Sequence, residues 1–77
     1  MKDSKKSKEN FDEELQKKIY EILKEANVPL ITSEIAEKLN LERRVVLRRL
    51  QRMAIEGKVR GRRIDAANGI WIWWISL

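Results

Sequence analysis

Hydrophobic residues recur every three or four positions in three stretches of the chain. The first stripe contains Phe11, Leu15, Ile19, Ile22, Leu23 and Ala26, and its spacing predicts an amphipathic helix. Asn10, with Glu13 three positions later, predicts the start of that helix. Asn27 and Pro29 predict its end. Residues 1–10 hold no apolar stretch, so we expect a disordered, mildly basic tail and one folded domain over residues 11–77.

Two further helices are predicted in the middle of the chain. Leu30 and Ile31 indicate a short strand stub near residues 29–31. Thr32 or Ser33 is expected to cap a second helix that ends at Asn40 and Leu41, and Asn40 suits a sharp turn because Asn tolerates left-handed backbone. The third helix is expected from about Glu42 to Glu56, with Gly57 ending it. Its inner stripe consists of Val46, Leu50, Met53 and Ala54.

The spacing of apolar residues changes after Gly57. Residues 58–64 predict a strand that runs into a loop, and residues 65–69 predict a turn around Asn68 and Gly69. Residues 70–75 are β-branched and aromatic, which is typical of a strand. The chain is therefore predicted to be an α+β protein with three helices and a C-terminal two-stranded β-hairpin.

The composition removes most kinds of chemistry. The chain has 77 residues without His or Cys, so disulfides, thiolate metal sites and the usual proton-transfer side chain are all missing. No phosphate-binding loop or nucleophile arrangement can be found. We expect a binding protein rather than an enzyme, with no cofactor and no metal.

The net charge of +5 is concentrated in one segment. Residues 42–63 carry nine positive and two negative side chains, and all eight arginines lie there. A run of charge often marks only a solvated helix face. The choice of arginine favours a binding surface over a solvated face, because its planar fork of donors suits phosphate and the guanine edge. An acidic partner is therefore expected.

The second and third helices carry a resemblance to a known family. Residues 32–41 (TSEIAEKLNL), followed by Val46, Leu50, Met53 and residues 56–59 (EGKV), resemble the DNA-binding core of the winged helix-turn-helix family of bacterial and archaeal regulators. The resemblance covers residues 11–77 and assigns no subfamily. It implies that the third helix lies in the major groove of duplex DNA and that the hairpin forms the wing.

The resemblance also implies which residues bind DNA. They are Arg43, Arg44, Val45, Arg48, Arg49 and Arg52 on the third helix, and Lys58, Arg60, Arg62 and Arg63 on the wing. Arg44 and Arg48 would pair with guanine edges, whereas Arg52 and the wing residues would reach phosphates or the minor groove. Val45 would contact a thymine methyl group or add to the core.

The chain departs from the Z-DNA-binding branch of this fold. That branch has an Asn and a Tyr on the third helix, where this chain has Leu47 and Gln51. Its wing has two prolines before a tryptophan, whereas residues 68–70 before Trp71 contain none. We therefore do not expect Z-DNA binding.

Residues 45–47 form an apolar run on the third helix. One residue of this run could face a partner protein instead of DNA.

Three tryptophans lie close together in the last strand. Alternation places Trp71, Trp73 and Ile75 on one face and Ile70, Ile72 and Trp74 on the other. One set can pack on the helices while arginine side chains partly cover the other. Alternatively, Trp71, Trp73 and Trp74 belong to an exposed patch for a homodimer or another protein partner. No small-molecule ligand is predicted.

Two functions remain open. The first is a sequence-specific double-stranded DNA-binding protein, a small transcription regulator. The alternative is a winged-helix interaction module in a transcription, replication or repair assembly, which uses the Trp/Ile strand as its contact. No segment approaches the ~20 apolar residues that cross a bilayer, so we expect a cytoplasmic protein with no membrane partner. High charge and nine isoleucines resemble thermophile composition and favour an archaeal source.

Overall fold

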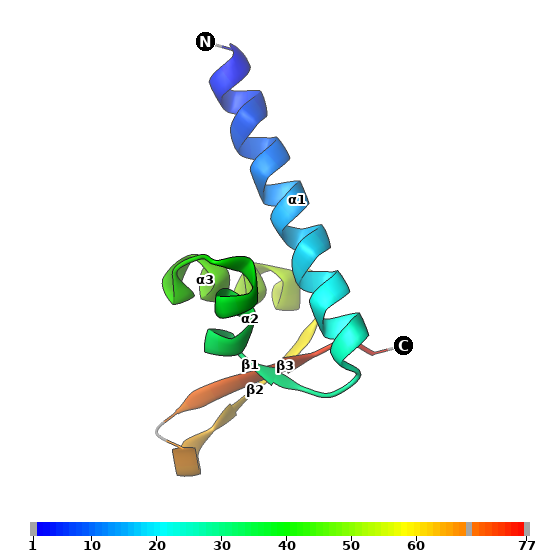
Figure 1. Cartoon of the computed structure of the whole chain (residues 1–77), viewed down its shortest axis with the longest axis vertical. Helices are drawn as coiled ribbons and strands as arrows, with labels where there is room; N and C mark the ends of the chain where they lie inside the picture. The colour runs from blue at the N-terminus through cyan, green and yellow to red at the C-terminus, as the bar shows by residue number, and fades with distance from the viewer. Residues whose placement is uncertain (1, 68, 77) are drawn as a thin grey trace.

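Three helices pack on one side of a small antiparallel sheet (Figure 1). The computed structural model describes the backbone of residues 2–67 and 69–76 and the side chains of residues 11–66 and 69–76. Along this part of the chain the elements are α1 (Lys2–Ala26), β1 (Leu30–Ile31), α2 (Thr32–Leu39), α3 (Arg43–Ile55), β2 (Arg60–Ile64), a 3-10 turn η1 (Asp65–Ala67) and β3 (Ile70–Trp74). The predicted α+β class, with three helices and a C-terminal hairpin, is confirmed, and the arrangement is compatible with a winged helix.

Helix α1 is longer than the sequence predicted. It spans Lys2–Ala26, so the predicted start at Asn10 is wrong, and residues 2–10 have helical backbone where we expected disorder. No Gly or Pro interrupts residues 2–26, and the Lys and Glu that dominate them are good helix formers. The N-terminal half of α1 extends past the other helices in Figure 1. The division into a tail over residues 1–10 and a domain over residues 11–77 stays a prediction.

The ends of the helices fall where the sequence placed them. Asn27 after α1 and Asn40 after α2 both have a φ of 57°, and Gly57 after α3 has a φ of 79°. Asn and Gly adopt this left-handed backbone at lower cost than other residues. At the second turn the Leu41 amide donates to the carbonyl of Ala36 at 3.0 Å, which fixes the connection between α2 and α3.

The strand stub turns the hairpin into a three-stranded sheet. The strand order is β1-β3-β2, with β3 antiparallel to both neighbours. β1 places Leu30 opposite Trp73, and β2 places Gly61 opposite Trp73 from the other side. At the hairpin tip, Gly69 has a φ of 74° and its amide donates to the carbonyl of Ile64 at 3.1 Å. Asn68, the other predicted turn residue, lies outside the described residues.

The core is formed by the predicted apolar stripes and one face of the sheet. Its buried members are Leu15, Ile19 and Leu23 of α1, Leu30, Ile35, Ala36, Val46, Leu50, Met53, Val59 and Trp73. The three residues from α3 repeat at steps of four and three, so that one side of α3 faces inward. The opposite side of α3 is left to solvent.

Trp73 is the central side chain of this core. Only 1% of it is exposed, and its indole nitrogen donates a 2.7 Å hydrogen bond to the hydroxyl of buried Thr32. A Cβ at Gly61 would lie 2.3 Å from the same ring, so glycine is what lets the indole lie flat against β2. Trp71 stacks on Trp73 with ring centroids 5.3 Å apart.

The hydrogen bond from Trp73 corrects two predictions. α2 starts after Ile31 without a side-chain cap, so the expected cap from Thr32 or Ser33 is wrong, because Thr32 is the first helical residue and its hydroxyl serves Trp73. Trp73 also cannot belong to an exposed partner surface while the domain is folded.

No helix in the described part of the chain combines the length and the apolar character needed to cross a bilayer.

Candidate nucleic-acid interface

The solvent-facing side of α3 carries two arginines in line. Arg44 and Arg48 are exposed and lie one helical turn apart, roughly 6 Å along the axis, on the side opposite Val46 and Leu50. Among the side chains that the structure describes, neither guanidinium forms an ion pair or a side-chain hydrogen bond. Both donor forks are therefore free to bind an external acceptor.

Between the start of α3 and the hairpin tip lies a hollow of about 300 Å³. Its walls come from β1, α2, α3, the hairpin turn and β3, namely Ile31, Thr32, Ser33, Arg43, Leu47, Gly69, Ile70 and Trp71. Arg43 is exposed and is the only charged residue of this wall. The exposed arginines of α3 thus continue into a concave surface that the hairpin bounds.

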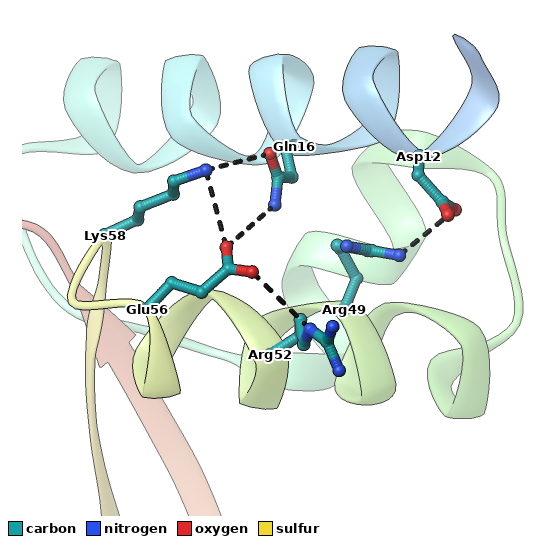
Figure 2. Close-up of polar contacts among 6 residues, drawn as sticks. All are labelled: Asp12, Gln16, Arg49, Arg52, Glu56 and Lys58. Atoms are coloured by element: carbon teal, nitrogen blue, oxygen red, sulfur yellow. Dashed lines mark hydrogen bonds and ion pairs between the residues drawn. The ribbon is translucent and has the colours of Figure 1, made fainter. Parts of the chain in front are cut away.

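Three of the predicted DNA-binding residues have partners at the junction of α1 and α3 (Figure 2). Arg49 pairs with Asp12 of α1 at 3.1 Å, and its side chain is only 20% exposed. Lys58 lies 3.4 Å from both Glu56 and Gln16, and Arg52 lies 3.5 Å from Glu56. Arg49 and Lys58 therefore point toward α1, and Arg52 reaches solvent beside this cluster.

Glu56 is at the centre of that cluster. It accepts a 3.5 Å hydrogen bond from the Gln16 amide and pairs with Lys58 and Arg52. The hydrogen bond from Lys58 is the main reason that the pKa of Glu56 lies below its ordinary value of 4.5, and the charges of Lys58 and Arg52 act in the same direction. The contacts join α1 to the end of α3, although exposed pairs of this kind stabilise a fold only weakly.

The lowered pKa predicts a pH effect. Because Glu56 binds its proton less readily in the folded state, the cluster contributes fully above the unfolded pKa and loses its contribution as pH falls through the folded pKa, below 4.5. A carboxyl-carbon NMR titration should give a midpoint for Glu56 below 4.5, and Lys58→Met should raise it. Lys38→Met removes the same charge from α2 and should leave the Glu56 midpoint in place. Equal midpoints in the two variants would contradict the contact.

The four positive residues that the sequence assigned to the wing point in different directions. Arg63 lies opposite Trp71 in the sheet register, on the face that packs toward the helices. It pairs at 3.6 Å with Asp65, the first residue after β2. Arg60 and Arg62 lie opposite Trp74 and Ile72, and therefore on the other face of the sheet. Of the three wing arginines, only Arg63 lies on the face of the sheet that packs toward the helices.

The three residues of the apolar run on α3, residues 45–47, also differ in how far they are buried. Val46 is buried, Leu47 is half-buried and packs against the core, and Val45 is 37% exposed. Val45 is not part of the core cluster, so its contact with a thymine methyl group stays a prediction.

The exposed side of α3 also holds two residues that sequence reasoning did not select. Gln51 is exposed and lies seven residues after Arg44, on the same side of the helix. Its amide has the donor and acceptor that pair with adenine. Ile55 continues that line and is 83% exposed. The helical period was the available signal, because steps of four and three from Arg44 and Arg48 lead to both residues.

The chain was compared with protein-family models, with curated proteins and with solved structures, and none of them matches it. The interpretation of the site therefore depends on its own geometry. That geometry offers unpaired guanidinium groups on an exposed helix beside a concave wall. Within the described residues, no group of three or more acidic, His or Cys side chains lies close enough to hold a metal ion.

Proposed function

We propose that this chain is a winged-helix protein that binds double-stranded DNA by placing α3 in the major groove. The observation that carries the proposal is the pair of exposed, unpaired arginines, Arg44 and Arg48, on the side of α3 that faces away from the core. A helix with its side chains is about 10–12 Å wide, and the major groove is about 12 Å wide. The exposed side of α3 has the dimensions and the donors that such a groove requires.

The arginines divide into two roles under this proposal. Arg44 and Arg48 face base edges, where each guanidinium can donate to the O6 and N7 of one guanine. Arg43 at the hollow, Arg52 near the end of α3 and Arg63 on the hairpin contact phosphates and set the orientation. Arg49 and Lys58 are left out, because their partners on α1 and α3 hold them away from this side.

The salt dependence of DNA binding tests the proposal. About three to five neutralised phosphates would give log affinity a slope of roughly −3 to −4.5 against log salt on B-form DNA. Fluorescence anisotropy of a labelled duplex at several salt concentrations measures that slope. A slope near zero, or the same affinity for an uncharged polymer of similar size, would overturn DNA binding.

Among DNA-binding roles, that of a small transcription regulator fits this surface best. Such a chain acts by occupancy, since bound α3 and hairpin would block or recruit other proteins on the duplex. Selection of bound sequences from a random duplex pool tests the sequence preference. Enrichment of guanine steps is expected from Arg44 and Arg48, whereas an unenriched pool would leave only non-specific binding.

A second candidate is an interaction module that binds another protein. The observation that favours it is the exposure of large apolar side chains outside the helices, since Val28 is 57% exposed and Ile70 is 43% exposed. Trp73 contributes nothing to it because it is buried. The homodimer that the sequence suggested would therefore use Trp74 on one face of the sheet or Trp71 on the other.

A further inference from the structure

One face of the sheet points away from α2 and α3, and in the described part of the chain only the end of α1 and residues 27–29 border it, at one end. By the strand register it consists of Arg60, Arg62 and Ile64 from β2 and Ile70, Ile72 and Trp74 from β3, and we call it the outer-sheet face. Ile72 and Trp74 are only partly buried. Figure 1 shows α2 and α3 together on the other side of the strands. Four large apolar side chains thus lie beside two arginines on this face.

One end of this face contains a hollow of about 280 Å³. It is lined by Leu23, Lys24, Asn27, Val28, Pro29, Arg62, Ile72, Trp74 and Ile75. Its walls are mainly apolar, and its charged residues, Lys24 and Arg62, are both cations. The hollow therefore suits an apolar side chain that has a negative charge next to it.

The charges of this face lack partners within the chain. Among the described side chains, Arg60, Arg62 and Lys24 form no ion pair. A second copy of the chain would bring its own Arg60 and Arg62 to the same contact, where like charges repel. Duplex DNA would supply phosphates, but its apolar groups belong to the bases within the grooves and do not project from the backbone into a hollow. A protein segment that carries both carboxylates and an apolar side chain would pair with the cations and fill the apolar hollow.

We propose that the outer-sheet face docks an acidic segment of another protein, with one large apolar side chain seated between Val28 and Trp74 and carboxylates paired with Arg62, Lys24 and Arg60. This surface and the exposed side of α3 lie on different sides of the sheet, so both can be occupied together. The proposal does not depend on DNA binding, and either can fail alone.

A designed peptide tests the docking surface on the full chain. The probe is a short capped peptide with a central phenylalanine flanked on both sides by glutamates. One control peptide has serine in place of phenylalanine, and another has glutamine in place of glutamate. We expect only the probe to bind measurably by fluorescence anisotropy, and to shift the NMR signals of Val28, Ile72 and the Trp74 indole.

Two charge-reversed variants separate docking from general attraction. R62E should weaken the probe about tenfold, since a charge pair becomes a repulsion. R44E makes the same change on α3 and should alter probe affinity less than twofold. Both residues are exposed, so both variants are expected to fold, and thermal unfolding is the check.

Five results would overturn the proposal, and the first four concern the probe and the oligomeric state. They are no binding of the probe, equal weakening by R62E and R44E, NMR shifts confined to α3, or a dimer in sedimentation analysis that R62E or V28S dissociates. The last of these four would assign the outer-sheet face to a second copy of the chain. Probe binding that duplex DNA displaces, together with loss of DNA affinity in R62E, would assign the arginines to DNA and likewise overturn the proposal.

Discussion

Replacing Trp73 with alanine is expected to unfold much of the protein at room temperature. Truncation of a buried tryptophan costs about 3–5 kcal/mol, and the buried Thr32 hydroxyl that loses its donor adds about 1–3 kcal/mol. A domain of this length has a free energy of unfolding of about 4–12 kcal/mol. The loss therefore approaches the whole stability, and urea denaturation followed by far-ultraviolet circular dichroism measures it.

The close fit of the Trp73 ring against Gly61 is also expected to contribute to stability. Gly61→Ala alone should cost about 1–3 kcal/mol, because the indole is held on its other sides by the core and cannot move without strain. In a Trp73→Leu background the distal ring is gone, so the added cost of Gly61→Ala should be smaller. A cost of Gly61→Ala that is equal in both backgrounds would show that the ring contact is not its cause.

A second pair of variants isolates the hydrogen bond. Trp73→Phe leaves Thr32 without its donor, and Thr32→Val in that background removes the unpaired hydroxyl, so the double variant should recover part of the stability. Ile55→Ala is the matched truncation of an 83% exposed side chain and should change stability by less than about 0.5 kcal/mol.

Local patterns in the sequence predicted most of the fold. The apolar stripes predicted α2, α3 and the inner side of α1, and Asn27, Asn40 and Gly57 marked the helix ends because a left-handed residue is a local requirement. The start of α1 was misplaced because Asn10 carries a cap signal that a longer run of good helix formers overrides. Thr32 was misjudged for another reason, since its hydroxyl binds a tryptophan forty-one residues away.

The candidate site was less predictable, because the direction of each arginine depends on tertiary neighbours. Arg44 and Arg49 look equivalent in the sequence, yet Arg49 meets Asp12 only because α1 crosses that side of α3. Arg62 and Arg63 are adjacent, and strand alternation sends them to opposite faces once the register with β3 is known. The sequence located the positive segment, and packing divided it into three surfaces.

Removing Arg44 and Arg48 together is expected to abolish specific DNA binding. Each guanidinium paired with a guanine contributes about 1–3 kcal/mol of discrimination, so the double alanine variant should lose at least about 30-fold in affinity for the selected duplex. The matched control is Arg60→Ala with Arg62→Ala, which removes the same two charges from the outer-sheet face. We expect less than about a threefold loss there, and equal losses in the two double variants would contradict a binding face on α3.

Lysine at the same two positions separates charge from geometry. Arg44→Lys with Arg48→Lys keeps both charges but lacks the planar fork that pairs with guanine. The variant should therefore keep the salt slope and the affinity for unselected duplex, while its preference for the selected duplex falls. The rise between Arg44 and Arg48, roughly 6 Å, corresponds to about two base steps, so the selected duplexes should carry guanines about two base pairs apart. If the lysine variant retained the full preference for those duplexes, the two residues would act as phosphate contacts, and specificity would come from Gln51, Val45 or the shape of the duplex.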